Sequence, residues 1–262
     1  MKKTAIFMLS LALVAGMLSG CSGDSSDSSA KDSSSAADSS SVAETSAETS
    51  EEETMDDDEN YDTGDASLDD IRNQDNIGDN ELLVLSFGTS YNESREATIG
   101  AIEKAIAEAF PETETRRAFT SQIIIDKLKE RDGLEIDNVK EALDRAAADG
   151  ITELVVQPTH LMHGAEYDEL TEAVESYKDK FESVTIAEPL LGEVGDSDDA
   201  VNDDKKAVAE AITAEAVKTA GYESLDAAKE DGTAFVFMGH GTSHTANVTY
   251  NQMQTQMELS LI

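Results

Sequence analysis

The stretch Leu82-Leu83-Val84-Leu85-Ser86-Phe87-Gly88-Thr89-Ser90 decides the fold of this chain. Four consecutive apolar residues followed by small and polar residues are typical of a buried strand that ends in a turn. The next segment is predicted to be an amphipathic helix, because apolar residues recur at helical spacing from Ile99 to Phe110 and Pro111 lies just past its end. The globular part of the chain therefore begins with a strand followed by a helix.

The same alternation of strand and helix continues to the C-terminal part of the chain. Further strands are predicted at residues 114–119, 154–157, 184–187 and 234–238, and helices at about 121–133, 138–149, 166–181 and 204–220. This order predicts a three-layer α/β fold with a parallel sheet. Ligands of such sheets bind beyond the carboxyl ends of the strands, which is where the polar turns of this chain lie.

The N-terminus has the pattern of a secretion signal. Lys2 and Lys3 precede a short apolar run that is too short to span a bilayer comfortably, so residues 1–20 are predicted to be a signal peptide. The run ends in Leu18-Ser19-Gly20-Cys21, which resembles a bacterial lipobox. We expect lipidation of Cys21 and an extracytoplasmic protein anchored to a bacterial membrane; an ordinary signal peptide with an incidental cysteine is the alternative. Cys21 is the only cysteine, which excludes an intrachain disulfide.

Acidic residues dominate the composition, and the formal net charge is −37. Such a chain repels phosphate backbones, which argues against nucleic-acid binding. Residues 21–80 are rich in Ser, Asp and Glu and poor in apolar residues, so this segment is predicted to be a disordered, extended linker. Its carboxylates could sequester metal, but carboxylate runs without ordered spacing favour a solvated spacer.

All four histidines follow predicted strand ends: His160 and His163 after the third strand, His240 and His244 after the fifth. Neutral imidazole is the commonest metal ligand and a proton acceptor near neutral pH. The glycines that flank His240 remove side-chain bulk and would let a large planar ligand approach the ring. For His160, a structural role in packing its turn is weighed equally with a role in the site.

Other chemistries have weaker support in this sequence. Four histidines could supply a zinc hydrolase with ligands, but there is no His-Glu-x-x-His helix. Ser86 and Ser90 could be nucleophiles, yet no Gly-x-Ser-x-Gly elbow surrounds them. The turn at residues 87–90 could bind a phosphate or carboxylate through its amides. Neither a Walker motif nor Gly-x-Gly-x-x-Gly is present, so no nucleotide is expected.

Several segments together resemble the anaerobic sirohydrochlorin cobaltochelatases, the class II tetrapyrrole chelatases. These segments occur in the family's order and span almost the whole globular part: residues 83–91 (Leu-Val-Leu-Ser-Phe-Gly-Thr-Ser-Tyr), 117–121 (Arg-Ala-Phe-Thr-Ser), 129–133 (Lys-Glu-Arg-Asp-Gly), 156–160 (Val-Gln-Pro-Thr-His), 164–167 (Gly-Ala-Glu-Tyr) and 235–244 (Phe-Val-Phe-Met-Gly-His-Gly-Thr-Ser-His). Each segment alone is a weak signal, and the set is a specific one.

The resemblance implies two similar α/β halves with the active site between them. Residues 81–190 would be the first, complete half, and residues 191–262 a connecting segment and the start of a second half that is mostly missing. It also implies insertion of a divalent metal into a tetrapyrrole without ATP, with cobalt(II) as the substrate metal and other divalent metals left open. The partner is therefore a tetrapyrrole, contact with the membrane is through the lipid only, and a homo-oligomer is left open.

The resemblance also assigns roles to single residues. His240 lies in Met-Gly-His-Gly and maps onto a metal-holding histidine of the family, so it is expected to be both metal ligand and catalytic base. Glu166 is the expected acidic catalytic partner. Substrate binding is expected from Ser86, Gly88, Thr89, Arg117 and His160, with Arg117 gripping a substrate carboxylate through its bidentate fork. The alternative function is a surface lipoprotein that captures a tetrapyrrole or metal without catalysis.

Overall fold

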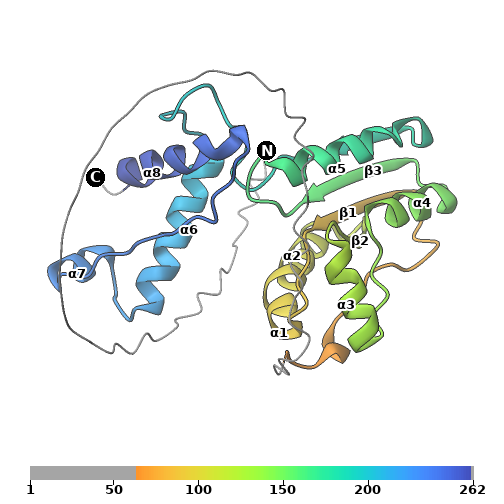
Figure 1. Cartoon of the computed structure of the whole chain (residues 1–262), viewed down its shortest axis with the longest axis horizontal. Helices are drawn as coiled ribbons and strands as arrows, with labels where there is room; N and C mark the ends of the chain where they lie inside the picture. The colour runs from red at the N-terminus through yellow and green to blue at the C-terminus, as the bar shows by residue number, and fades with distance from the viewer. Residues whose placement is uncertain (1–62, 261–262) are drawn as a thin grey trace, which may run out of the picture. The chain divides into compact units, whose positions relative to one another are not determined.

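A computed structural model describes residues 63–260 of the chain and contains a four-stranded parallel sheet (Figure 1). The strands are β1 (Asn80–Ser86), β2 (Glu114–Phe119), β3 (Glu153–Pro158) and β4 (Ser183–Ile186), in the order β2-β1-β3-β4. All three pairings are parallel, with Leu83 of β1 beside Arg116 of β2 and Val156 of β3. The predicted α/β class with a parallel sheet is therefore confirmed.

Helices connect successive strands, as parallel pairing requires. They are α1 (Asn92–Arg95), a π-helical turn (Glu96–Gly100) and α2 (Ala101–Ala109) after β1; α3 (Gln122–Asp132) and α4 (Val139–Asp149) after β2; and α5 (Ala165–Glu175) with a 3₁₀ turn (Lys178–Lys180) after β3. The C-terminal part contains α6 (Asp203–Thr219), α7 (Leu225–Glu230), a 3₁₀ turn (Thr245–Asn247) and α8 (Val248–Ser260). Gly133 and Gly150 end α3 and α4 in the left-handed conformation.

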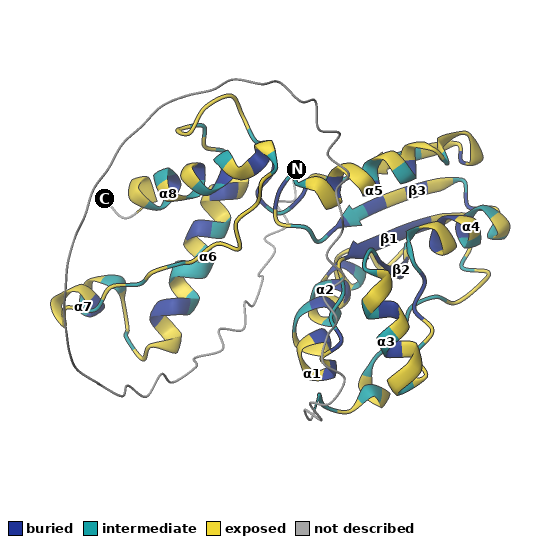
Figure 2. Ribbon diagram, in the orientation of Figure 1, coloured by how far each residue is buried: buried dark blue, intermediate teal, exposed yellow. Residues whose placement is uncertain are grey.

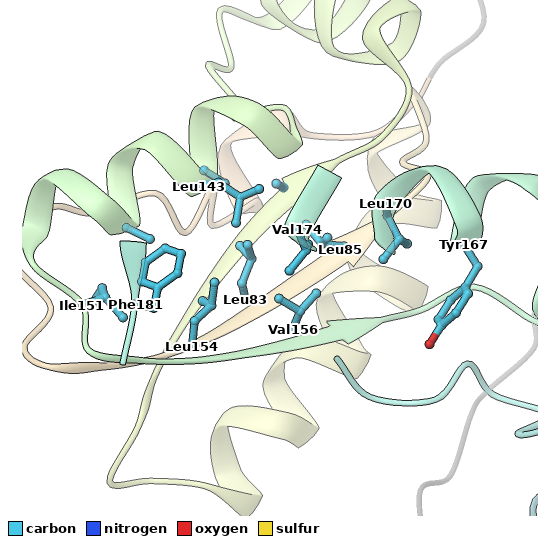
Figure 3. Close-up of a cluster of buried hydrophobic side chains, with 13 residues drawn as sticks. Leu83, Leu85, Leu143, Ile151, Leu154, Val156, Tyr167, Leu170, Val174 and Phe181 are labelled. Atoms are coloured by element: carbon cyan, nitrogen blue, oxygen red, sulfur yellow. The ribbon is translucent and has the colours of Figure 1, made fainter. Parts of the chain in front are cut away.

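One face of the sheet carries the larger hydrophobic core. Leu83 and Leu85 of β1 project from this face, and β3 adds Leu154 and Val156 (Figure 3). Helices α4 and α5 cover these side chains with Leu143, Leu170, Val174 and other apolar residues. The alternation along β1 thus sends every second residue toward the same pair of helices.

The opposite face of the sheet is covered by α2 and α3. Leu82 and Val84 of β1 pack with Ile106 of α2, and Phe119 of β2 packs with Leu128 of α3. Because β1 is buried on both faces, its sequence is a continuous apolar run rather than an alternating one. The predicted three-layer arrangement is present in this part of the chain.

The structure corrects the predicted end of the linker at residue 80. Residues 63–79 include a 3₁₀ turn (Ala66–Leu68) and pack against the domain. The Asp69 carboxylate accepts hydrogen bonds from Arg95 and Arg117, while Ile71 and Ile77 pack on the two cores. The composition of residues 63–79 does not reveal that Asp69 pairs with two buried arginines of the domain. The signal peptide, Cys21 and the rest of the predicted linker lie outside the described residues.

The structure also corrects the predicted fifth strand. Residues 234–238 adopt no strand pairing, and Val236 and Met238 are 89% and 95% exposed. Figure 2 shows the connection between α7 and α8 mainly as exposed and intermediate residues. A strand is stabilised by a neighbour that pairs its backbone groups, and within residues 63–260 no strand lies beside this segment.

Helices α6, α7 and α8 make the remainder of the described chain, and the predicted helix at 204–220 is confirmed as α6. Asn202 caps α6 by accepting a hydrogen bond from the Lys205 amide at 2.7 Å. The buried Lys205 ammonium donates to the carbonyls of Leu191 and Glu193, which fixes the start of this region. In the described part of the chain, none of the helices combines the length and the apolar character that crossing a bilayer requires.

Candidate functional site

The carboxyl edge of the sheet between β1 and β3 is the topological switch point, because the chain leaves β1 toward β2 on one side and β3 lies on the other. Ligands of open α/β sheets bind at such points. The Thr159 hydroxyl donates to the Ser86 hydroxyl at 2.9 Å, and the Thr159 amide donates to the Leu85 carbonyl. Ser86 is only 1% exposed, so it closes the edge of the sheet rather than offering a hydroxyl to a substrate.

His160 directly follows this switch point. Both of its ring nitrogens are buried and have no hydrogen-bond partner within the described residues. Burial lowers the pKa of His160, while the negative charge of Glu166 opposes this shift. The imidazole is therefore held neutral at the edge of the sheet. Glu166 itself is exposed in the first turn of α5 and can reach solvent.

Two arginines donate hydrogen bonds to backbone carbonyls of the turn after β1. Arg95 donates to the Thr89 carbonyl at 3.0 Å, and Arg131 donates to the Ser90 carbonyl at 2.7 Å. Gly88 has φ +100°, and a Cβ at this position would lie 2.7 Å from the Phe119 ring. The amides of Gly88, Thr89 and Ser90 donate no hydrogen bond within residues 63–260. The carbonyls of Thr89 and Ser90 are therefore hydrogen-bonded to arginines, and the amides of residues 88–90 are available to an anionic group.

Arg117 is a correction to the predicted substrate-binding set. Its guanidinium makes two hydrogen bonds of 2.7 Å to the Glu103 carboxylate and a further pair to Asp69. The residue is 1% exposed. Its bidentate fork is already used by carboxylates of the same chain, so Arg117 anchors α2 and the segment before β1 and does not grip a substrate.

His240 lies on an exposed loop between α7 and α8. Its Nδ1 is 2.9 Å from the Gly241 carbonyl oxygen, which can only accept a hydrogen bond, so Nδ1 carries a proton and Nε2 is the nitrogen that the neutral ring offers to a ligand. Tyr250 of α8 holds the loop: its hydroxyl accepts from the Gly241 amide at 2.9 Å, and a Cβ on Gly239 would clash with its ring. Close contact with Tyr250 explains Gly239, whereas Gly241 has φ +83° and open space around it.

The other two histidines contact acidic residues around α5. The Nε2 atom of His244 is 3.2 Å from the Asp168 carboxylate, and the Nε2 atom of His163 is 2.6 Å from that of Glu188. The His163 ring also packs edge-on against Tyr167, with centroids 4.4 Å apart. Asp168 follows Glu166 by two residues, so the contact with His244 brings the His240 loop to the first turns of α5. The structure thus gathers part of the predicted set at one edge.

Within residues 63–260 no group of three or more His, Cys, Asp and Glu side chains is arranged to hold a metal ion. An open groove of about 840 Å³ lies between α3 and α4, lined by acidic residues such as Asp126 and Glu141. None of the four histidines lines it, so it is separate from the candidate site.

Sequence reasoning missed three residues of this edge: Asp168, Glu188 and Tyr250. Asp168 lies in the first turn of α5 and Glu188 lies just after β4, so both could have been found as acidic residues near the edge where the histidines were predicted. Tyr250 carried no signal of its own, because its role depends on how α8 folds back onto the His240 loop.

A parallel α/β sheet with histidines near its carboxyl edge defines an α/β protein with a candidate ligand site at that edge. A comparison with family models specifies it further. The model described as cobalt chelatase (CbiK) matches residues 80–260, and the chain belongs to this family.

Two curated proteins are similar to the chain. It is 34% identical over 169 residues to a sirohydrochlorin cobaltochelatase of Salmonella typhimurium, covering 64% of this chain and 57% of that protein. It is 31% identical over 192 residues to the sirohydrochlorin cobaltochelatase CbiKC of Nitratidesulfovibrio vulgaris, covering 72% of this chain and 61% of that protein. The chain therefore spans about three-fifths of the length of these relatives.

Among solved structures, a CbiX protein of Marinobacter aquaeolei VT8 covers 42% of this chain and 82% of its own, with 19% identity and a TM-score of 0.29. The fold assignment depends on the strand order of this chain itself rather than on that likeness.

Proposed function

We propose that this protein inserts cobalt(II) into sirohydrochlorin or a closely related tetrapyrrole without ATP. Family membership and the relatives named as sirohydrochlorin cobaltochelatases support the reaction class. The observation that carries the proposal is the tautomer of His240: with Nδ1–H directed to the Gly241 carbonyl, the exposed ring offers Nε2 to a metal. Histidine ligands of metals characteristically donate their other ring nitrogen to such a carbonyl.

Each residue of the edge has a role in this proposal. The free amides of residues 88–90 bind a carboxylate of the macrocycle, which orients the ring over the carboxyl edge of the sheet. His240 presents the divalent metal to the pyrrole nitrogens. Two pyrrole protons leave to solvent as the metal enters, and the exposed Glu166 carboxylate is the group that accepts and relays them. The charge balances because one divalent cation replaces two protons in the ring.

The test is metal insertion by purified protein supplied with sirohydrochlorin and cobalt(II), followed by the change in the visible spectrum of the macrocycle. His240→Ala is expected to lower the rate at least tenfold below that of the parent. His163→Ala is the matched control, since it removes an imidazole at the same edge that contacts Glu188 and is not assigned to the metal. An H240A rate equal to the parent's would exclude the assignment.

A second function has a specific observation in its favour. Within residues 63–260, no group of three or more His, Cys, Asp and Glu side chains is arranged to hold a metal ion. A surface protein that captures a tetrapyrrole or a metal without turnover needs only binding. Tight binding of sirohydrochlorin that quenches its fluorescence, with no spectral change after cobalt is added, would favour this function over catalysis.

We further propose that Cys21 is lipidated and anchors the protein outside the cytoplasm. Support comes from the order of Lys2-Lys3, a short apolar run and Leu18-Ser19-Gly20-Cys21. Mass spectrometry of the protein extracted from membranes should find a diacylglyceryl group on Cys21. Cys21→Ala should release the protein into the soluble fraction; an unchanged membrane fraction would exclude the lipid anchor.

A further inference from the structure

Arg95 is a fully buried arginine whose guanidinium donates to three acceptors at once. Its Nε donates to the Asp69 carboxylate at 2.6 Å, its Nη1 to the Thr89 carbonyl at 3.0 Å and its Nη2 to the Asn92 side-chain oxygen at 2.6 Å. Because the guanidinium is planar and rigid, the directions of these three bonds are fixed relative to one another. The position of the Thr89 carbonyl is therefore tied to the positions of the other two acceptors.

Asn92 links Arg95 to a second arginine and to the segment before β1. The Asn92 Oδ1 atom also accepts from Arg131 at 3.3 Å, and Arg131 donates to the Ser90 carbonyl. The Asn92 Nδ2 atom donates to the Gly64 carbonyl at 3.1 Å. These bonds form one network that ends on two carbonyls of the turn after β1. All of its members belong to the segment before β1 or to the part of the sheet region that ends with α3.

Net charge does not account for this arrangement. Arg95 and Arg117 both pair with Asp69, and Arg117 also pairs with Glu103. Two guanidinium groups therefore face two carboxylates, and the four charges cancel. What Arg95 supplies to the turn is thus a direction and not an excess of positive charge.

The direction matters because a peptide group is planar and trans. The Thr89 carbonyl and the Ser90 amide belong to the same peptide group, so they point in opposite directions. With the carbonyl bound to the buried guanidinium, the Ser90 amide points away from Arg95. Hydrogen bonds weaken steeply as their angle falls, so an amide that is aimed correctly binds an anion better than one that can rotate.

We propose that Arg95 is a positioning residue for substrate binding, which aims the Ser90 amide at a carboxylate of the tetrapyrrole by holding the Thr89 carbonyl. This inference rests on the proposed function, in which the amides of residues 88–90 bind that carboxylate. Arg95 is fully buried and does not touch the substrate itself. Asp69 fixes the guanidinium, so the segment before β1 contributes to substrate binding through Arg95.

Arg95→Lys in the full chain tests this role. The lysine keeps the positive charge, but one ammonium group cannot replace a planar fork that serves Asp69, Thr89 and Asn92 on three sides. The dissociation constant of sirohydrochlorin, measured by fluorescence without cobalt, should rise about tenfold. A change of this size is the scale of one hydrogen bond to a charged group.

Arg116→Lys is the matched control. Arg116 is also buried, pairs with Glu81 and Asp149, and has no hydrogen bond to the turn at residues 88–90 within residues 63–260. Both substitutions should lower the urea midpoint, because each disturbs a buried ion pair. Only Arg95→Lys should weaken the binding of sirohydrochlorin.

The kinetics of metal insertion separate positioning from a loss of folded protein. Arg95→Lys should raise KM for sirohydrochlorin about tenfold and leave kcat unchanged, because a misaimed amide weakens substrate binding without changing the chemical step. Partial unfolding would instead lower kcat and leave KM as it is. The affinity for cobalt(II), measured by calorimetry, should equal that of the parent, because His240 is not part of the network.

Two results would overturn the inference and leave the proposed function intact. One is an Arg95→Lys protein that binds sirohydrochlorin as tightly as the parent, and the other is an equal loss of affinity in Arg116→Lys. A parent that binds no sirohydrochlorin would overturn the proposed function and the inference with it. The parent measurement alone therefore distinguishes the two kinds of failure.

Discussion

Residues 82–85 and residues 234–238 are both apolar segments that lead into a glycine-containing turn, and they lie in opposite environments. In β1, Leu83, Val84 and Leu85 are fully buried between two neighbouring strands and two layers of helix. In the second segment, Val236 and Met238 are almost fully exposed. The difference teaches that an apolar run specifies only the capacity to form a strand, and that neighbours with free backbone groups decide whether the strand forms.

The two regions also differ in how they use charge. The sheet region buries Arg95, Arg116 and Arg117 against carboxylates, so its polar interior is fixed by ion pairs. The His240 region contains no charged Asp, Glu, Lys or Arg from residue 232 to residue 257 and depends on single hydrogen bonds such as that of Tyr250. We therefore expect mutations of the first region to change global stability, and mutations of the second to change local geometry.

The largest expected effect is at Arg117 in the sheet region. Arg117→Ala removes the bidentate partner of the buried Glu103 carboxylate and leaves it only Arg72 at 3.4 Å, and removal of one member of a buried ion pair typically costs about 3–5 kcal/mol. Urea unfolding measured by circular dichroism checks the loss. Lys140→Ala breaks only the exposed pair with Asp144 and should leave the midpoint unchanged. A small effect of Arg117→Ala would mean that the Glu103 carboxylate is not buried in an ion pair as the structure has it.

The next effect compares the two apolar segments directly. Leu83→Ala empties a fully buried site in the larger core and should destabilise the protein by about 2–5 kcal/mol. Met238→Ala makes the same kind of truncation at a side chain that is 95% exposed, and should leave the urea midpoint of the single chain unchanged. Equal losses from the two substitutions would break the comparison, because they would require residues 234–238 to be part of a packed sheet.

The sequence predicted the sheet region well for a physical reason. Strands 114–119, 154–157 and 184–187 are β2, β3 and β4 almost to the residue, since each lies between a predicted helix and a turn-forming segment. Helix ends at Gly133 and Gly150 are equally local, because they depend on one left-handed residue each. Pattern reasoning succeeds where the information is confined to a few neighbouring residues.

The misses all concern partners far away in the sequence. The role of Arg117 depends on Glu103 and on Asp69, which lies 48 residues earlier in a segment with the composition of a linker. The positions of Asp168 and Glu188 relative to His244 and His163 depend on tertiary packing. His240 was predicted from its motif and stays a prediction, whereas the position of its Nδ1 proton could be assigned only from the hydrogen bond to Gly241.

A smaller effect should depend on pH and belongs to the sheet region alone. Burial raises the pKa of Glu81 from the ordinary 4.5 to about 7, with Asp149 and Asp137 adding to the rise and Arg116 and Arg145 opposing it. Between these two pH values the folded protein holds a proton that the unfolded chain has lost, so the stabilising contribution is full below pH 4.5 and declines as pH rises toward 7. The loss is at most about 3 kcal/mol.

Glu81→Gln isolates this contribution from that of the many other carboxylates. Relative to the parent, the variant should gain stability as the pH of the urea experiment is raised from 5 to 8, because glutamine cannot ionise. A difference between the two proteins that stays constant over this range would show that Glu81 titrates at its ordinary pKa.

The smallest effect on stability is expected at Tyr250, where the comparison becomes one of function. Tyr250→Phe removes the acceptor of the Gly241 amide and should cost about 0.5–1.5 kcal/mol in urea unfolding. Tyr222→Phe is the matched control, because that hydroxyl bonds Asp231 and Thr233 and touches no part of the His240 loop.

The two tyrosine variants should separate when cobalt(II) binding is measured by calorimetry. If Tyr250 fixes the loop that presents Nε2 of His240, Tyr250→Phe should weaken cobalt binding several-fold, while Tyr222→Phe should bind as the parent does. Urea unfolding of both variants is measured alongside, so that a difference in binding can be separated from partial unfolding. Equal cobalt affinity in both variants would mean that the His240 loop presents its imidazole without help from α8, and the region would then owe its function to the sequence of the loop alone.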